Sequence, residues 1–280
     1  MKKAIVGVLL AAFAVVAHAS TSKDLESSAV VDGTIVLAKD GTVQAAEIKD
    51  EPKYGKPIAD MVRKAASQWL FYPVLREGKP VAARVSMHVR VVLQKTADGN
   101  YSARIKGATF GDMDRKSTDA LRIAEGNKNI PPRYPQDALR AHAQGTVYLA
   151  LRVDRSGHVT DAIAEQVNLA NIGRDSILRQ YRDLMAKATL EAARRWTYQV
   201  PTTGRLASQD SWTAHVPVTF TLNDLPAPPT DPVWKTYVPG PYTQAPWSDK
   251  PDMGGVDAVA NDGVRTEGAD PVLLPSPHHG

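Results

Sequence analysis

The sequence contains no cysteine among its 280 residues. This absence excludes disulfide bonds, thiolate metal sites and a lipid anchor attached through cysteine. A folded chain of this composition must therefore be held together by packing and hydrogen bonds. Its hydrophobic content of 43% is ordinary for a globular protein and is sufficient for a core.

Recognisable catalytic motifs are also missing. There is no Gly-x-Ser-x-Gly elbow, no Walker loop and no His-Glu-x-x-His. The seven histidines are scattered, and none has a second candidate ligand at metal spacing. We therefore expect a non-catalytic protein with no cofactor and no metal site.

Long hydrophobic runs are scarce, and the longest lies at the start of the chain. Ala4–Ala17 is apolar throughout its 14 residues, follows Lys2 and Lys3, and precedes Ala17-His18-Ala19. This order predicts a secretory signal peptide over residues 1–19. The run is shorter than the roughly 20 residues of a spanning helix. The alternative is an uncleaved membrane anchor, which would indicate that the protein is an energy transducer.

Charge is unevenly distributed along the chain. The formal net charge is +4 in total, but the segment 226–280 has three basic and seven acidic residues. The same segment carries 11 of the 20 prolines, which predicts a disordered or polyproline-like tail. Its aromatic residues are expected either to fold back on the body, which is favoured, or to bind a partner; they are Trp234, Tyr237, Tyr242 and Trp247. The small positive excess of the body does not indicate nucleic acid binding.

The most informative stretch extends from Tyr134 to Leu222. Alternating apolar residues over 147–153 predict a strand, Asp154–Gly157 predict a turn, and Val159 begins a second strand. A helix is expected over 181–196 and a last strand over 216–222. This order of strand, turn, strand, helix and strand is a complete α+β layer.

A shorter version of the same pattern begins near residue 33. Gly33-Thr34-Ile35 matches Gly145-Thr146-Val147, and Asp40-Gly41 is a hairpin signal. Equivalent glycines are 112 residues apart and equivalent tryptophans 127 apart, so the second copy has 15 additional residues. We expect this insertion within Leu169–Gln180. The aromatic residues at the helix ends are interpreted as structural core, namely Trp69, Trp196 and Tyr198.

The ordered set of Tyr-Pro, Gly-x-Val, Asp-x-x-Gly-x-Val and Trp-x-Tyr resembles the carboxy-terminal domain of the TonB family. The resemblance implies two α+β domains in tandem, each a three-stranded antiparallel sheet with a helix on one face. It also implies a periplasmic location and contact with the amino-terminal peptide of an outer-membrane transporter. The expected organisation is a signal peptide at 1–19, domains at 20–95 and 131–225, a connector at 96–130 and a tail at 226–280.

A sheet edge is the expected binding site, because an extended peptide can add there as a further strand. The strand Val85–Leu93 has no proline and is predicted to be such an edge, unless the second copy or a hairpin at Tyr101 covers it. Pro217 indicates an edge in the second copy as well. The predicted peptide-binding residues are Val85, Ser86, Met87, His88, Val89, Arg90 and Val91.

Two functions remain open from the sequence. The first is a non-catalytic TonB-like module that engages an outer-membrane transporter or modulates energy-coupled transport. The second is a structural envelope protein that binds peptidoglycan or another periplasmic protein. Neither involves nucleic acid, and neither has a stable membrane anchor once the signal is cleaved.

Overall fold

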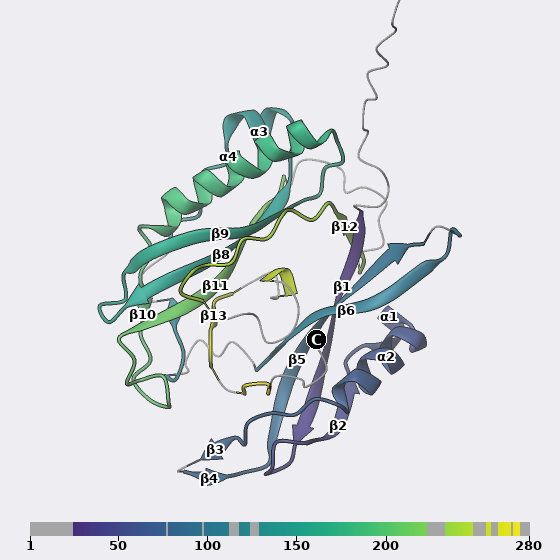
Figure 1. Cartoon of the computed structure of the whole chain (residues 1–280), viewed down its shortest axis with the longest axis vertical. Helices are drawn as coiled ribbons and strands as arrows, with labels where there is room; N and C mark the ends of the chain where they lie inside the picture. The colour runs from purple at the N-terminus through teal and green to yellow at the C-terminus, as the bar shows by residue number, and fades with distance from the viewer. Residues whose placement is uncertain are drawn as a thin grey trace, which may run out of the picture.

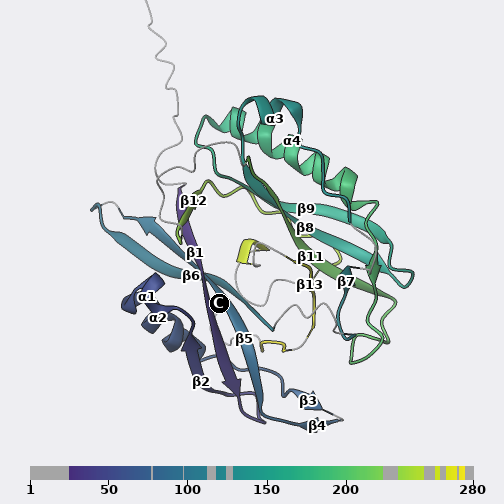
Figure 2. The same cartoon turned by 180° about the vertical axis from the view of Figure 1, so that it is seen from behind.

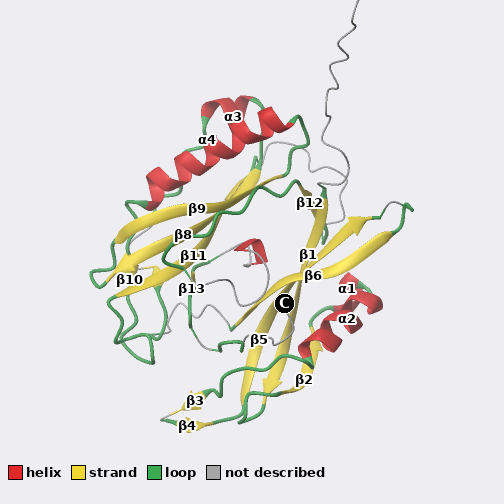
Figure 3. Ribbon diagram, in the orientation of Figure 1, coloured by secondary structure: helices red, strands yellow, loops and turns green. Residues whose placement is uncertain are grey.

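The computed structural model describes residues 25–76, 78–96, 98–111, 118–123, 129–222, 233–248, 256–258, 263–269 and 271–274. Two sheets face each other, and each carries helices on its outer side (Figures 1 and 3). Parts of the carboxy-terminal segment lie between the sheets. The expected signal peptide lies outside the described residues. Among those residues, no helix combines the length and the apolarity that crossing a membrane requires.

The first unit contains a five-stranded antiparallel sheet. Its strands follow the order β12-β1-β5-β6, and β2 pairs with the second half of β1, from Gly33 to Leu37. The elements up to β6 are β1 (Glu26–Leu37), β2 (Val43–Ile48), α1 (Glu51–Tyr54), α2 (Lys56–Ala66), β3 (Leu75–Arg76), β4 (Lys79–Pro80), β5 (Ala83–Lys95) and β6 (Tyr101–Phe110).

The second unit contains a four-stranded sheet in the order β13-β11-β8-β9, with α4 on its outer face. Its elements are β7 (Arg122–Ile123), α3 (Gln136–Arg140), β8 (Gly145–Asp154), β9 (Val159–Leu169), α4 (Asp175–Ala193), β10 (Tyr198–Gln199) and β11 (Ser211–Phe220). The carboxy-terminal segment adds β12 (Lys235–Tyr237), a 3-10 helix (Val256–Ala258) and β13 (Arg265–Thr266).

The central strand β8 is buried on both faces, although alternation predicts one apolar face. In β8, Leu149 and Leu151 pack in the core with residues of α4, and their neighbours Tyr148 and Ala150 point to the other face. All four are at most 5% exposed. The second face is buried because it is turned toward the other sheet and the carboxy-terminal segment.

The three aromatic residues predicted as core lie inside the two units. Trp69 is 9% exposed, and its ring meets that of Phe110 edge to face at 5.0 Å. Trp196 and Tyr198 are 6% and 4% exposed and belong to the core beneath α4. Each unit therefore has an aromatic anchor where its helix leads back to the sheet.

The hairpin turns of the two units have the same backbone geometry. Gly41 has φ +87° and accepts a hydrogen bond from Phe71 N–H at 2.9 Å. Gly157 has φ +81° and accepts one from Tyr198 N–H at 2.8 Å. A Cβ on either glycine would lie 2.0 Å or less from the carbonyl oxygen of the same aromatic residue. Both turns therefore need glycine for conformation and for space.

Replacing Gly157 with alanine is expected to destabilise the protein more than the same change at Gly99. Gly99 also has a positive φ, of +86°, but an added Cβ there meets none of the described atoms within 4 Å. The Gly99→Ala variant should lose about 1–2 kcal/mol through backbone strain alone. The Gly157→Ala variant should lose a further ~1–3 kcal/mol from overpacking against the Tyr198 carbonyl. Equal denaturant midpoints for the two variants would contradict this account of the turn.

The additional residues of the second unit are not where the sequence predicted them. The helix α4 begins at Asp175, six residues before the expected start, and has 19 residues where α2 has 11. Strand β9 has 11 residues where β2 has six. The additional residues are therefore spread over a longer strand and a longer helix, and do not form one inserted loop within Leu169–Gln180.

The expected connector 96–130 contributes a strand to the first sheet. Residues Thr96–Asn100 turn the chain back, since Thr96 N–H donates to Asn100 O at 2.8 Å. The returning chain forms β6, which pairs with β5 along its length. With β6 and β12 the first sheet has five strands, and with β13 the second has four, so both exceed the predicted three.

The described parts of the tail are ordered against the body, which corrects the expectation of a disordered tail for these residues. β12 pairs with β1, and β13 pairs with β11. The 3-10 helix contacts both β6 and β9 and lies between the sheets (Figure 2). Val238, Ala245 and Val256 are at most 4% exposed. Burial of these apolar side chains and strand pairing compensate for the cost of ordering a proline-rich chain.

Candidate functional site

The strand predicted to bind a peptide is not an edge. β5 pairs with β1 on one side and with β6 on the other, so that Val89 lies between Val31 and Ala108. Its backbone groups are therefore already used by the sheet. The prediction of a peptide-binding edge at Val85–Leu93 is wrong because the next hairpin returns along the same strand, the exception that the sequence left open.

The side chains of β5 are also engaged in the fold. Val85, Met87, Val89 and Val91 face the first core and are at most 8% exposed. On the opposite face, Arg90 is 5% exposed and donates to Ser28 Oγ at 3.0 Å. His88 Nδ1 lies 2.7 Å from Asp32 Oδ1, and this hydrogen bond lowers the pKa of Asp32 despite its partial burial. Ser86 is half-buried and pairs with Thr34.

The outer side of β11 is a sheet edge that the tail covers only in part. β13 covers it through two residue pairs, Ala214 with Thr266 and His215 with Arg265. Thr213 O accepts a hydrogen bond from Glu267 N–H at 2.9 Å and therefore points outward. Because alternate residues of a strand point their backbone groups the same way, Pro217 and Thr219 face outward too. Pro217 lacks a donor there, as expected for an edge.

Another part of the tail lies along the outer side of β9. Leu169 and Val238 exchange two backbone hydrogen bonds of 3.1 and 2.7 Å, and Thr243 N–H donates to Glu165 O at 2.8 Å. From α4, Arg182 donates to Val167 O at 3.2 Å and to Pro239 O at 3.1 Å. Both outer strands of the second sheet are thus paired, in part, with the chain's own carboxy-terminal segment.

A buried group of charges joins the two sheets and the tail, and is called the inter-sheet cluster. Lys106 Nζ lies 2.5 Å from Glu26 Oε2 and 2.6 Å from Asp257 Oδ2. Tyr237 donates its hydroxyl proton to Glu26 Oε2 at 2.8 Å. Burial first, and then the charges of Asp257 and Glu26, raise the pKa of Tyr237, so the phenol stays protonated. Asn168 completes the cluster by donating to Asp257 Oδ2 at 2.9 Å.

A second charged group surrounds His215 and is called the His215 cluster. Nδ1 lies 3.3 Å from Glu165 Oε2 in β9, and Nε2 lies 3.4 Å from Glu267 Oε2, which follows β13. Burial by itself lowers the pKa of His215, but its interactions with the two carboxylates outweigh burial, and the net shift is upward. The two ring nitrogens face different carboxylates, so the arrangement is a bridge between segments.

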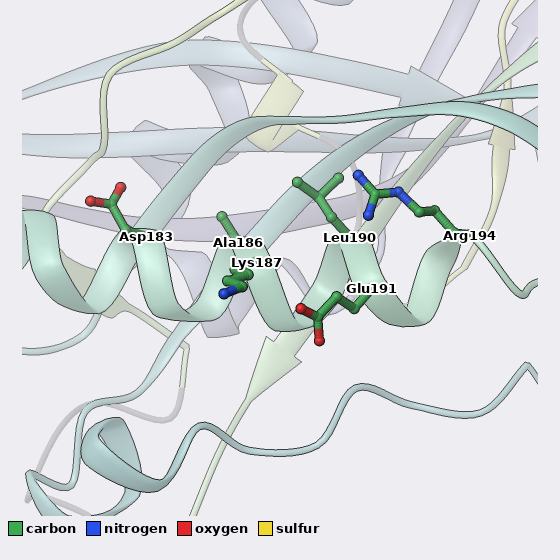
Figure 4. A pocket seen from close by; sticks show the side chains of 6 residues that line it. All are labelled: Asp183, Ala186, Lys187, Leu190, Glu191 and Arg194. Atoms are coloured by element: carbon green, nitrogen blue, oxygen red, sulfur yellow. The ribbon is translucent and has the colours of Figure 1, made fainter.

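A hollow on the outer face of α4 offers no convergent binding site. Figure 4 shows its side chains spread along one helix instead of pointing to a common centre. Its lining residues are Asp183, Ala186, Lys187, Leu190, Glu191 and Arg194. Among the residues that the structure describes, no group of three or more histidine and acidic side chains has the arrangement of a metal site.

Sequence reasoning missed the ion pairs of His215 and the strands that the tail adds to the sheets. In the sequence, His215 is one of seven scattered histidines without a recognisable partner. Its partners lie 50 and 52 residues away along the chain, so no local spacing connects them. The acidic character of the tail was visible, but charge alone does not tell which residue meets a buried histidine.

Comparison with known proteins gives one similarity. The chain is 35% identical over 101 residues to the proteins named TonB of two strains of Xanthomonas campestris pv. campestris. The matched region covers 36% of this chain and 39% of each relative, well under half of either. No family model matches, and no solved structure matches. The similarity and the sheet-rich α+β architecture support a TonB-like carboxy-terminal domain within this chain.

Proposed function

We propose that this protein is a non-catalytic, TonB-like binding protein of the periplasm that takes part in energy-coupled transport. Its partner would be the extended amino-terminal peptide of a TonB-dependent outer-membrane transporter. The similarity to TonB proteins supports the transport role. The periplasmic location rests on the expected signal peptide at residues 1–19.

We further propose that the two units are copies of one fold. The matching turns at Gly41 and Gly157 support this, as does the equal position of Gly33 and Gly145 in their sheets. An added Cβ on either of these two glycines would lie 2.4 Å from a carbonyl oxygen of the neighbouring strand. The same local constraint at the same place in each unit favours duplication over chance resemblance.

The observation that carries the proposed binding mode is the short pairing of β13 with β11. An extended segment of this chain already adds to the outer side of β11, and it uses two residue pairs. The backbone of β11 beyond His215 continues to Phe220, with Pro217 and Thr219 facing outward by alternation. A transporter peptide would gain affinity from backbone hydrogen bonds to this edge and selectivity from alternate side chains.

Replacing Thr219 with proline is expected to weaken binding of a transporter amino-terminal peptide by about three- to tenfold. The change removes one outward N–H, and a single hydrogen bond contributes about 0.5–1.5 kcal/mol. The Thr219→Ala variant is the matched control, because it keeps the N–H and should bind almost as the wild type does. Titration calorimetry provides the affinities, after circular dichroism has shown that both variants fold.

The possible outcomes separate the function from the site. Absence of heat with every transporter peptide tested would contradict the proposed function. Equal affinities of the proline variant and the wild type would place the docking edge away from Thr219. Co-sedimentation with purified peptidoglycan without peptide binding would favour the structural envelope role instead.

A further inference from the structure

The carboxy-terminal segment meets the outer side of β11 in a short stretch, residues 263–269, which is called the strap. Its backbone holds β11 through the pairs at Ala214 and His215 and through the bond from Glu267 N–H to Thr213 O. Thr266 Oγ1 also accepts a hydrogen bond from Leu121 N–H at 2.8 Å. Thr266 is 3% exposed. The strap therefore occupies one end of the β11 edge along which the proposed peptide would pair.

The His215 cluster ties this strap to the middle of the sheet. The Glu165 side chain is 1% exposed, that of His215 14% and that of Glu267 23%. Glu165 Oε1 accepts a hydrogen bond from Ala245 N–H at 3.0 Å. Its Oε2 has no hydrogen bond within the described part of the chain, and its charge is balanced across the 3.3 Å ion pair with His215.

Other polar groups complete the surroundings of His215. Arg265 lies directly across from it in the β11–β13 register, and Ala150 of β8 lies on its other side. Ser248 Oγ donates to Glu267 Oε2 at 2.9 Å. Tyr242 lies near both carboxylates: burial raises its pKa first, and the charges of Glu165 and Glu267 raise it further. Tyr242 is therefore neutral across the range in which an imidazole titrates.

We propose that the strap is a protonation-dependent cover of the β11 edge, which protonated His215 holds closed by bridging Glu165 and Glu267. Loss of the proton releases residues 263–269 and exposes the backbone of β11 to an extended peptide. The release is a property of this chain alone. Its consequence for a partner rests on the proposed function.

The direction of the pH dependence follows from the two states of His215. With the strap in place, burial lowers the pKa of His215, but interaction with Glu165 and Glu267 raises it by more, so the net pKa is above the ordinary value of 6.5. With the strap released, the contact with Glu267 is lost, and less of this upward shift remains. Closure is therefore complete at acidic pH and weakens as the pH rises through the raised pKa.

Deprotonation also removes the charge that balances Glu165. A buried carboxylate without a cation is costly, since the pair was desolvated together. Water reaching the cluster after the strap moves away lowers that cost. The rest of the tail has separate attachments, the Leu169–Val238 bonds and the Lys106–Asp257 ion pair. Opening should therefore be confined to the strap.

Hydrogen exchange measured by mass spectrometry on the wild-type chain tests the proposal directly. After correction for the intrinsic pH dependence of exchange, segments 211–217 and 263–269 should exchange about tenfold faster at pH 8.5 than at pH 5.5. This is the scale of one hydrogen bond to a charged group. The segment around Val238 should show no such change.

Two variants and one control identify the group responsible. His215→Gln should remove the pH dependence, and Glu267→Gln should reduce it while leaving the buried pair of Glu165 and His215 in place. The Glu267 variant also serves if His215→Gln fails to fold. His158 is exposed in the hairpin turn, so His158→Gln should retain the wild-type pH dependence. The proposal would be overturned if corrected exchange in the wild type were equal at both pH values. It would also be overturned if both cluster variants kept the wild-type pH dependence of exchange.

A second measurement separates this inference from the proposed function. Peptide affinity at pH 5.5 and 8.5 should rise with pH in the wild type, in step with exchange of the strap. If exchange depends on pH but no peptide binds, the protonation-dependent cover is supported and the transporter-peptide function is contradicted. Peptide binding together with pH-independent exchange would contradict the strap and leave the function intact.

Discussion

Replacing Lys106 with methionine is expected to lower the free energy of unfolding by about 3–5 kcal/mol, because one partner of a buried charge cluster is removed. The ammonium lies within 2.6 Å of carboxylate oxygens from both Glu26 and Asp257. The two carboxylate side chains are 11% and 1% exposed. Methionine is also unbranched and only one heavy atom shorter than lysine, so the loss would be mainly that of the charge. Chemical denaturation provides the measurement.

Two controls make this prediction specific. Lys56 forms a 2.6 Å ion pair with Asp60, but its side chain is 77% exposed, and Lys56→Met should unfold almost as the wild type does. Glu26 keeps its 2.6 Å ion pair with Arg104, whereas Asp257 loses its lysine partner. Adding Asp257→Asn to the Lys106 variant should therefore recover part of the loss, because it neutralises that buried carboxylate. A Lys106→Met protein as stable as the wild type would show that water reaches the cluster, and that the sheets do not depend on it.

Truncating Trp196 to alanine is expected to cost about 3–5 kcal/mol, a large share of the roughly 5–15 kcal/mol that stabilises a typical domain. The indole is 6% exposed beneath α4, and its N–H donates to Ile130 O at 2.9 Å. The truncation leaves a cavity and removes this hydrogen bond. Thermal and chemical denaturation should both show the loss.

Two further variants divide the effect into its parts. Trp196→Phe keeps an aromatic ring but loses the N–H, so it should lose only part of the stability. Tyr101 is 67% exposed, and Tyr101→Ala should change the midpoint little because it leaves no buried cavity. If Trp196→Ala had the same melting temperature as the wild type, the assignment of this residue to the core would be wrong.

Local patterns predicted much of each unit. Alternation located the strands β8, β11 and β5, and the hairpin at Asp154–Gly157 has the positive φ that its glycine indicates. The start of α4 was less accurate. Apolar spacing shows which side of a helix is buried but is less informative about the first turn, where many residues are acceptable.

The peptide-binding site was predicted less well than the strands, and the physical reason concerns pairing. Alternation in Val85–Val91 reports that one face is buried, and this is correct. It does not report which strand lies beside the backbone. β5 is covered by β1, about 57 residues earlier at its centre, and by β6 from the following hairpin. An edge strand is one that lacks a neighbour on one side. The local sequence pattern of a strand does not show whether another strand pairs with that side.

The sequence by itself determined the local elements: where strands alternate, where glycine turns the chain and which aromatic residues enter a core. Those properties depend on side-chain periodicity and backbone conformation within a few residues. Only the tertiary structure decided that the described parts of the proline-rich tail lie along β9 and β11, and that His215 lies between Glu165 and Glu267. These contacts join segments 50 or more residues apart, and they form because the folded sheets present open edges and a buried charge that this segment can satisfy.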